Sequence, residues 1–229
     1  MPSKAIPGSP EAPVMAALFA EVYRLRLLRG LEDLLAQWGY GRIAGVDEVG
    51  RGCLAGPVVA AAVIVDPRCV VPGVDDSKCL SREERERLAA AIRASALAVA
   101  VAEVPAEVID RVNILEATRR AMCQSLRALR PSPDCAVIDA VALRDLCFPC
   151  FPVIRGDAWS YAVACASIVA KVERDRRMVE MDRRYPQYGF ASHKGYSVPE
   201  HLQALSTYGP CPIHRLTFRP VVPRVGSPC

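Results

Sequence analysis

A short acidic segment between two apolar runs limits the folds open to this chain. Residues 45–52 read Gly-Val-Asp-Glu-Val-Gly-Arg-Gly. The runs on either side, residues 42–46 and 54–65, are apolar and rich in β-branched side chains, which favours two buried strands. Because the glycines between them permit a sharp change of direction, we expect a hairpin that carries the acids near its bend.

Asp47 and Glu48 are candidate metal ligands because of their place near the end of the first predicted strand. Adjacent residues of a regular strand point to opposite faces, so the two carboxylates share a site only where the strand ends or bends. Gly50 and Gly52 make such a bend possible. Hydrolysis of a phosphodiester with two divalent ions needs several carboxylate oxygens around ions about 4 Å apart. For this segment alone, the competing interpretation is a solvated acidic turn.

Two further acids follow predicted strands. Residues 135–139 form an apolar run that ends in Asp139, and residues 151–154 form another that precedes Asp157. Taken singly, Asp139 is typical of a turn, and Asp157 is typical of an N-cap on the long helix predicted for residues 158–183. The recurrence favours a different interpretation, since central strands of one sheet bring their ends together. Four carboxylates at one edge would hold two divalent ions.

Together with these acids, several other segments resemble the ribonuclease HII family, the type 2 ribonucleases H that cut RNA in RNA/DNA hybrids and at ribonucleotides embedded in DNA. The similar segments follow the family order from about residue 42 to about residue 222. They include Gly45-Val46-Asp47-Glu48-Val49-Gly50-Arg51-Gly52, Asp76-Ser77-Lys78, Gly156-Asp157, Ala166-Ser167-Ile168-Val169-Ala170-Lys171, His193-Lys194-Gly195-Tyr196 and Pro212-Ile213-His214-Arg215. The resemblance implies an α/β, ribonuclease H-like fold: a mixed five-stranded sheet flanked by helices, with a C-terminal cap of helices and loops.

The resemblance also implies the chemistry. The metal ligands of the family correspond to Asp47, Glu48, Asp139 and Asp157, the same acids that the strand-end pattern selects. They are implied to hold two Mg²⁺ or Mn²⁺ ions, one favouring the attacking water and the other the departing 3′ oxygen. Hydrolysis would then leave 5′-phosphate and 3′-hydroxyl ends, and no protein nucleophile would be needed.

Substrate contacts are implied in the same way. Gly50, Arg51 and Gly52 are implied to contact the ribose 2′-hydroxyl largely through the backbone, which glycine allows to approach closely. Tyr196 is implied to pack on the adjacent sugar, which would recognise an RNA-to-DNA junction; by itself it is an ordinary half-buried loop aromatic. Three lysines are implied to lie near the phosphate track: Lys78, Lys171 and Lys194.

The chain departs from the family pattern at two places. Ala140 follows Asp139 where the family commonly has glycine, so the turn after this ligand must suit a side chain. Residues 197–199 read Ser-Val-Pro where the family usually has glycine or proline and then threonine, so the resemblance alone does not establish a hydroxyl contact with phosphate here. Neither departure removes a metal ligand, so activity is still expected.

Other polar residues have two interpretations each. His193 and His214 are either phosphate or proton-transfer partners or satisfied structural histidines, and neither lies at zinc-ligand spacing. Asp175 lies four or more helical turns after Asp157 on the predicted helix, too far along it for a metal ligand. We expect it to form an ion pair with a neighbouring arginine, Arg174 or Arg176.

Functions of other classes are disfavoured by particular residues. A hybrid-binding protein without catalysis would lose a ligand, and all four acids are present. A P-loop phosphotransferase would need a Gly-Lys-Ser/Thr ending, which residues 45–52 lack. The related type 3 enzymes usually carry a β-rich N-terminal domain, whereas the first 40 or so residues here favour helix.

Bulk composition agrees with this interpretation without deciding it. The chain has 229 residues, which suits one domain with a full core. Its formal charge is +4 and its pI is near 8.6, so binding of an RNA/DNA hybrid or of ribonucleotide-containing duplex DNA must come from a local basic patch. No apolar run reaches about 18 residues, so no membrane span is expected.

Ten cysteines raise the question of zinc or redox chemistry. Cys147 and Cys150 have the two-residue gap of a zinc site, but no second such pair exists, and the other cysteines are scattered through apparent core segments. This usage and the lack of a signal peptide indicate a reducing cytoplasm. A monomer is the simplest expectation, and the sequence identifies no replication or transcription partner.

The predicted segments are a disordered N-terminal tail, an amphipathic helical extension, a catalytic domain and a C-terminal tail: residues 1–13, 14–40, 41–222 and 223–229. In the extension, apolar residues such as Leu18 and Val22 recur every three or four positions, with a break near Gly30, so we expect this face to pack on the main domain. The cap is expected to begin at about residue 185.

Between these landmarks the pattern alternates. Ser81 and Glu84 form a capping box at the start of a helix predicted for residues 81–94. A strand at residues 97–103 and a helix at residues 114–129 follow. Three successive strands and then two strands separated by helix predict the mixed five-stranded sheet.

Overall fold

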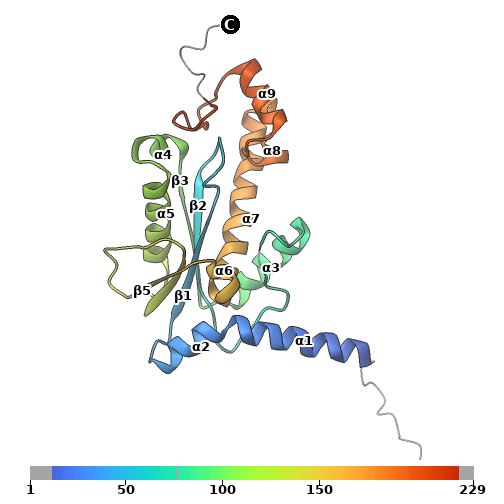
Figure 1. Cartoon of the computed structure of the whole chain (residues 1–229), viewed down its shortest axis with the longest axis vertical. Coiled ribbons are helices and arrows are strands. Elements are labelled where there is room, and N and C mark those ends of the chain that lie inside the picture. The colour runs from blue at the N-terminus through green and yellow to red at the C-terminus, as the bar shows by residue number, and fades with distance from the viewer. Residues whose placement is uncertain (1–11, 76, 222–229) are drawn as a thin grey trace, which may run out of the picture.

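A mixed five-stranded sheet forms the centre of the protein (Figure 1). The computed structural model describes residues 12–75 and 77–221. The strands are β1 Ile43–Val49, β2 Val58–Ile64, β3 Ala98–Val104, β4 Cys135–Asp139 and β5 Cys150–Val153. Their order across the sheet is β3-β2-β1-β4-β5. The predicted α/β class, with a mixed five-stranded sheet flanked by helices, is therefore confirmed.

Strand β1 lies in the middle of the sheet and has one neighbour of each orientation. It pairs antiparallel with β2, as the predicted hairpin requires, and parallel with β4. Strand β3 continues the antiparallel side and β5 the parallel side. Val46 lies opposite Ile138 in the parallel pair. The next residues along the two strands, Asp47 and Asp139, therefore come level at one edge of the sheet.

Helices cover both faces of the sheet (Figure 1). They are α1 Ala12–Leu28, α2 Gly30–Gln37, α3 Arg82–Ser95, α4 Ala106–Val112, α5 Ile114–Ala128, α6 Gly156–Trp159, α7 Tyr161–Arg184, the 3₁₀ helix η1 Pro186–Tyr188, α8 Phe190–His193 and α9 Pro199–Tyr208. Helix α5 packs on β1, β2 and β3 from one side. Helix α7 packs on β1 and β2 from the other side and is supported by α3.

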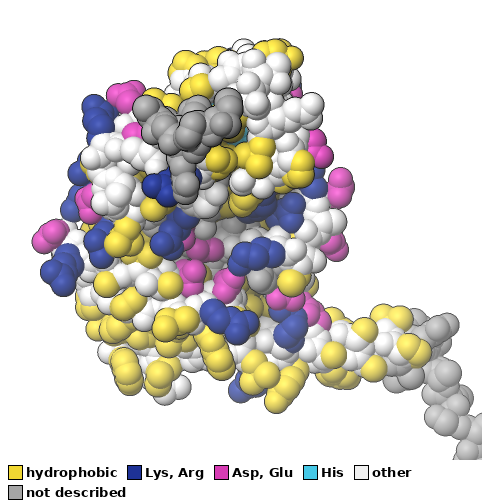
Figure 2. Space-filling view, turned by 45° about the horizontal axis from the view of Figure 1, so that its top comes forward, with side chains coloured by type: hydrophobic (Ala, Val, Ile, Leu, Met, Phe, Trp, Pro, Cys, Tyr) yellow, Lys and Arg dark blue, Asp and Glu magenta, His cyan; other side chains and the backbone are white. Residues whose placement is uncertain are grey.

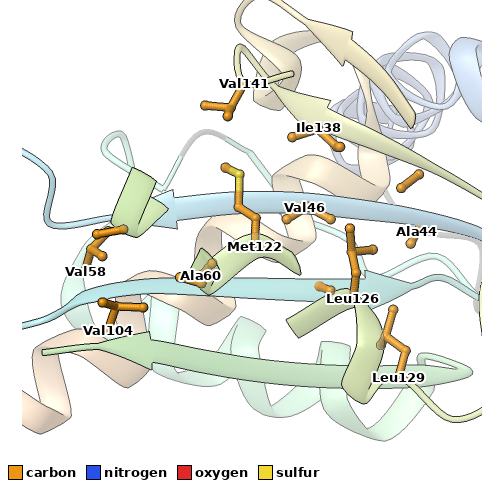
Figure 3. Packing of buried hydrophobic residues seen from close by; sticks show 14 of the residues in the cluster. Ala44, Val46, Val58, Ala60, Val104, Met122, Leu126, Leu129, Ile138 and Val141 are labelled. Carbon is orange, nitrogen blue, oxygen red and sulfur yellow. The ribbon is translucent and has the colours of Figure 1, made fainter. Parts of the chain in front are cut away.

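The core has one apolar layer on each face of the sheet. Met122 and Leu126 of α5 pack with Val46 on the first face (Figure 3). On the opposite face, Ala61 and Val63 of β2 belong to the layer under α7. This alternation follows from the period of two along a strand. Both faces are buried, which explains why the strands read as continuous apolar runs.

The close approach of α7 explains Gly45. A Cβ atom at this position would lie 2.0 Å from the carbonyl carbon of Ala162 and 2.2 Å from the backbone nitrogen of Val163. Any side chain here would push the first turn of α7 away from the strand that carries Asp47. Gly45 therefore belongs to the acidic motif for reasons of packing.

The N-terminal extension forms two helices that break at Gly30, as the pattern predicts. Leu25 and Leu35 are buried against the main body. Leu18 and Val22, however, are 54% and 55% exposed. The prediction that the whole apolar face packs on the domain is therefore wrong for the part of α1 that precedes Leu25, because this helix extends past the body (Figure 1).

The long helix predicted for residues 158–183 is divided in two. Helix α6 contains Asp157 in its first turn, and Ser160 is the N-cap of the much longer α7. The interpretation of Asp157 as an N-cap is thus wrong. Glu32 of α2 accepts hydrogen bonds from Ser160 Oγ at 2.5 Å and from the backbone N–H of Ala162 at 2.9 Å. The extension therefore helps to cap α7 directly beside the acids.

The capping box of Ser81 and Glu84 is present at the start of α3, as predicted. Helix α4 was not predicted. Within residues 12–75 and 77–221, each helix is too short or too polar to cross a bilayer. Residues 1–11 and 222–229, which hold most of the predicted tails, lie outside the described residues, as does Asp76 of the Asp-Ser-Lys motif.

Residues 185–221, which we call the cap, follow α7 and pack against its end (Figure 1). Tyr188 and Phe190 stack with their ring centroids 5.3 Å apart. They form an apolar cluster with Met178 of α7 and with Ala55, which lies in the loop between β1 and β2. The cap therefore contacts the loop that follows the acidic motif.

Candidate active site

Asp47, Glu48 and Asp139, which we call the acidic edge, converge at the edge of the sheet. One carboxylate oxygen of each lies within 4.8 Å of the others. Strand β1 continues to Val49, farther than predicted, but Gly50 then turns the chain with φ +94°. The acids thus meet where the strand ends, as expected. Figure 2 shows acidic side chains gathered in the middle of one face, with Lys and Arg side chains around them.

Burial and mutual repulsion make the acidic edge unfavourable without a cation. Burial, with the nearby charge of Glu48, raises the pKa of Asp47 to about 8. Burial also raises the pKa of Glu48, although Arg51, whose Nη1 lies 3.2 Å from Glu48 Oε1, opposes this. The other oxygen, Glu48 Oε2, is buried and has no hydrogen-bond partner among the described residues. An orphaned carboxylate oxygen among three acids fits a divalent cation.

Asp157 lies next to this group but outside it. The backbone N–H of Gly156 donates to Asp139 Oδ1 at 2.7 Å, which ties α6 to the end of β4. Asp157 itself lies 3.6 Å from Lys78, measured from Oδ2 to Nζ. The structure therefore brings three of the four predicted acids within ligand distance of one another, and it places the fourth beside a lysine that was predicted near the phosphate track.

Ser167 and Ser77 form a second layer behind Asp47. Ser167 of α7 hydrogen-bonds to Asp47, which opposes the rise in pKa of that carboxyl group. The two serine hydroxyls lie 2.9 Å apart, and both serines are buried. Because the Ser167 hydroxyl donates to the carboxylate, the Ser77 hydroxyl must donate to Ser167. This pair connects the Asp-Ser-Lys segment to the first acid, and the sequence pattern did not single it out.

Residues 50–57, which we call the glycine loop, are held by Arg215. Its guanidinium is fully buried and donates to the carbonyl oxygens of Gly50 at 2.7 Å, Arg51 at 2.8 Å and Gly56 at 2.9 Å. Burial lowers the pKa of Arg215 to about 10. The side chain of Arg215 therefore fixes the backbone of the predicted 2′-hydroxyl contact from behind.

Arg174 holds the other side of the glycine loop. It too is fully buried, and it donates to the carbonyl oxygens of Pro57, Ala55 and Lys194 at 3.0–3.2 Å. A Cβ atom at Gly50 would lie 2.1 Å from Arg174 Nε, so glycine is required there by packing as well as by its positive φ. Sequence reasoning did not predict that these two arginines are buried and hold the glycine loop, because arginine is normally a solvated residue.

The remaining predicted substrate residues lie on α7 and in the cap. Lys171 pairs with Asp175 at 2.6 Å, so the expected partners of Asp175, Arg174 and Arg176, are wrong: a lysine one turn earlier on α7 is the nearer cation. Tyr196 is 40% exposed, and its ring centroid lies 5.9 Å from the guanidinium carbon of Arg174. Lys194, two residues before Tyr196, is half-buried and donates to the carbonyl oxygen of Ala191.

The turn after Asp139 holds an alanine in an unfavourable backbone conformation. Ala140 adopts φ +50°, in the left-handed region that favours glycine. Its N–H donates to the carbonyl oxygen of Val153 at 3.0 Å, which joins this turn to the end of β5. The departure from glycine thus leaves local strain directly after a predicted ligand.

Histidine and cysteine residues lie outside the acidic edge. His193 and His214 are in the cap, where each ring nitrogen has a partner, which fits the structural interpretation. Cys147 is exposed and Cys150 is half-buried. Across residues 12–75 and 77–221, the acidic edge is the one cluster of His, Cys, Asp and Glu with metal-ligand spacing.

The sequence model of the family described as Ribonuclease HII matches residues 44–221. Curated relatives named Ribonuclease HII include that of Geobacter metallireducens, 51% identical over 196 residues, which cover 86% of this chain and 92% of the relative. That of Ruminiclostridium cellulolyticum is 48% identical over 198 residues, which cover 86% and 78%. The chain belongs to the ribonuclease HII family and is a ribonuclease H, an endonuclease that acts by hydrolysis.

Solved structures of related enzymes share the fold of this chain. Ribonuclease H2 of Pyrococcus horikoshii has a TM-score of 0.68 at 27% identity, covering 79% of this chain and 95% of that one. The RNase HII of Archaeoglobus fulgidus, solved as a complex with PCNA, has a TM-score of 0.64 at 29% identity, covering 78% and 95%. A type 3 enzyme, Bst-RNase HIII in complex with Mn²⁺, has a TM-score of 0.58 at 21% identity, covering 79% of this chain and 68% of that one, and shares the fold.

Proposed function

We propose that this ribonuclease H hydrolyses the RNA strand of RNA/DNA hybrids and incises duplex DNA on the 5′ side of an embedded ribonucleotide. The observation that carries the proposal is the adjacency of two features: a buried acidic edge with an orphaned carboxylate oxygen, and a glycine loop whose backbone is fixed from behind. The first suits cleavage of a phosphodiester and the second suits close contact with a sugar.

Asp47, Glu48, Asp139 and Asp157 would hold two divalent ions, Mg²⁺ or Mn²⁺. Once bound, these ions would act as Lewis acids toward the attacking water and the departing 3′ oxygen, leaving 5′-phosphate and 3′-hydroxyl ends. Lys78, 3.6 Å from Asp157, would balance the charge of this acid until a phosphate arrives. Oxygen ligands from carboxylates suit Mg²⁺ and Mn²⁺ better than softer ions.

Recognition of RNA is assigned to the backbone of Gly50, Arg51 and Gly52, and recognition of the following deoxyribose to Tyr196. The loop is supported by buried guanidinium groups, so it does not need to become ordered when the sugar arrives. This preorganisation favours discrimination of a single 2′-hydroxyl. The phosphate track is assigned to three lysines: Lys78, Lys171 and Lys194.

The same proposal includes a cytoplasmic location and a monomeric state. The described cysteines are all free thiols, and several of them lie in the core, as expected for chains that fold under reducing conditions. Separation of the purified protein by size, with and without a duplex, tests the monomer directly.

The test of activity uses end-labelled duplex DNA with one ribonucleotide, a uniform RNA/DNA hybrid and an all-DNA duplex. Each is incubated with the protein and Mg²⁺, Mn²⁺ or a chelator. We expect metal-dependent incision 5′ to the ribonucleotide, cleavage of the hybrid and no cleavage of the all-DNA duplex. Binding without incision under every condition would contradict the proposal and favour a hybrid-binding protein.

A further inference from the structure

The three histidines of the chain form one cluster inside the cap. The rings of His193 and His201 lie 4.5 Å apart at an interplanar angle of 17°, and those of His201 and His214 lie 5.2 Å apart. His201 and His214 are 0% and 2% exposed. Buried imidazole rings must satisfy both of their nitrogens, so their contacts define where each proton lies.

The contacts of His214 and His201 permit one arrangement of protons. The backbone N–H of Cys211 lies 2.9 Å from His214 Nδ1, closer than the Cys211 carbonyl oxygen at 3.3 Å, so this nitrogen accepts and the proton of His214 is on Nε2. His214 Nε2 lies 3.0 Å from His201 Nε2, so His214 donates and His201 accepts. The proton of His201 is therefore on Nδ1, which lies 2.9 Å from the carbonyl oxygen of Tyr196. We call this series of hydrogen bonds the histidine relay.

The relay ends at a turn that requires support. Lys194 and Gly195 both have positive φ, +53° and +82°. His193 accepts from the N–H of Gly195 through Nδ1, and its carbonyl oxygen accepts from the N–H of Tyr196. The carbonyl oxygen of Gly195 in turn accepts from the N–H of Leu54 in the glycine loop at 2.8 Å. The turn that carries Tyr196 is thus bonded to histidines on one side and to the glycine loop on the other.

We propose that His201, held by His214, is a positioning residue that fixes the backbone of Tyr196 and thereby the angle at which its ring meets the sugar at an RNA-to-DNA junction. This inference rests on the proposed function, which assigns the junction contact to Tyr196. A 40% exposed ring on a turn with two left-handed residues would otherwise have several orientations. The relay reduces these orientations before the substrate binds.

The relay requires neutral imidazoles, since a second proton on either ring would place two donors face to face. Burial and the neighbouring histidines lower the pKa of His214 to about 4, and burial also lowers the pKa of His201. Cys211, Tyr188 and Phe190 surround the pair without supplying a carboxylate. The arrangement therefore persists at neutral pH.

Two substitutions of one residue separate positioning from general packing. The amide nitrogen of Asn can replace His201 Nδ1 as donor to Tyr196, whereas Gln reaches the position of Nε2 and leaves that carbonyl without its donor. We measure kcat/KM for a single embedded ribonucleotide and for a uniform hybrid. The quantity compared is kcat/KM for the single ribonucleotide divided by kcat/KM for the hybrid. His201→Gln should lower this ratio by about fivefold to tenfold, which corresponds to one hydrogen bond, and His201→Asn by less than about twofold. Tyr196→Ala gives the reference loss.

Equal changes of the ratio in His201→Asn and His201→Gln would overturn the inference, as would an unchanged ratio in His201→Gln when Tyr196→Ala lowers it. If Tyr196→Ala affects both substrates equally, the junction assignment of the proposed function fails. The ¹⁵N resonances of the wild-type imidazoles then report on the relay separately. Protonation of His201 on Nδ1 and of His214 on Nε2 supports the positioning of Tyr196, and the opposite tautomers contradict it.

Discussion

The acidic edge and the cap differ in how far their buried polar groups are satisfied. At the acidic edge, Asp47 and Glu48 repel each other, and Glu48 Oε2 has no hydrogen-bond partner in the described part of the chain. In the cap and the glycine loop, the buried guanidinium of Arg215 and the imidazoles of His201 and His214 all have partners. The carboxylates of the acidic edge would therefore gain their missing partner from what binds there. The buried polar groups of the loop and the cap already have theirs.

The two regions are therefore suited to different tasks, the acidic edge to binding ions and the glycine loop to distinguishing RNA from DNA. A group of unsatisfied acids favours any divalent cation of suitable size, and by itself gives no discrimination between RNA and DNA. Discrimination requires a surface that does not adjust to the wrong sugar, and a fully bonded backbone provides one. The two regions meet at Gly50, which follows the acids in the chain and is bonded to Arg215.

The largest effect is expected from the acidic edge. Asp47→Asn or Asp139→Asn should lower kcat/KM for hydrolysis at least about 100-fold, since loss of a supporting partner of a metal ligand already costs about 10–100-fold. The substitution should leave binding of the duplex within a small factor. Glu107→Gln on α4, an exposed acid with a partner one turn away, is the control and should keep full activity. Full activity in either aspartate variant would refute the site.

Removal of the support behind the glycine loop should come next. Arg215→Ala leaves the carbonyl oxygens of Gly50, Arg51 and Gly56 without this donor, so we expect the free energy of unfolding to fall by about 3 kcal/mol or more, at about 1–3 kcal/mol for each carbonyl. Arg120→Ala, which removes an exposed arginine paired one turn away on α5, should cost less than about 0.5 kcal/mol. Urea unfolding of both variants measures the contrast, and equal losses would mean that the loop is not preorganised.

Acid should weaken the cap before it affects the sheet. Burial and the neighbouring His201 lower the pKa of His214 to about 4 in the folded protein, from an ordinary value of 6.5. The contribution of the neutral His214 to the free energy of unfolding is fully present above pH 6.5. It is lost as the pH falls toward 4, because the unfolded chain takes up the proton first, and the loss amounts to at most about 3 kcal/mol. His214→Gln keeps a donor toward His201 but does not titrate. The difference in unfolding free energy between wild type and variant should therefore shrink over this interval, and a constant difference would contradict the buried, neutral histidine.

The smallest effect concerns the strained turn at the acidic edge. Ala140→Gly should raise the free energy of unfolding by about 1 kcal/mol, since a left-handed alanine costs more than the added freedom of glycine. Ala142→Gly, two residues on and without a positive φ, should instead lower it by about 0.5 kcal/mol. The denaturant midpoint should rise in Ala140→Gly and fall in Ala142→Gly, relative to the wild type. Shifts in the same direction would show that Ala140 is not strained.

Much of the fold follows from local patterns in the sequence. Apolar runs that end in acids predict the strands of the sheet, and the Ser81 capping box predicts the start of α3. Such signals act over a few residues and are therefore visible in the chain itself. The same reasoning predicts that Asp47, Glu48 and Asp139 approach each other, because parallel strands place their carboxyl ends at one edge.

What the sequence could not predict depends on contacts between distant segments. Arg174 and Arg215 are typical surface residues by type, and their burial follows from carbonyl oxygens contributed by a loop more than 100 residues earlier. The break at Ser160 depends on Glu32, 128 positions before it. The exposed face of α1 has the periodicity of a packed helix, and no local signal shows that the body ends beside it. The assignments of Lys171, Lys194 and Tyr196 to substrate remain predictions.

The most direct test of the account is a calorimetric titration of Mn²⁺ into the wild-type protein and Asp139→Asn, without nucleic acid. We expect the wild type to bind the ion at the acidic edge and the variant to bind it at least about tenfold more weakly. Hydrogen exchange of the same samples should show equal amide protection of the glycine loop in both proteins. Equal affinity in the two proteins, or a glycine loop that becomes protected only when the ion binds, would contradict the account.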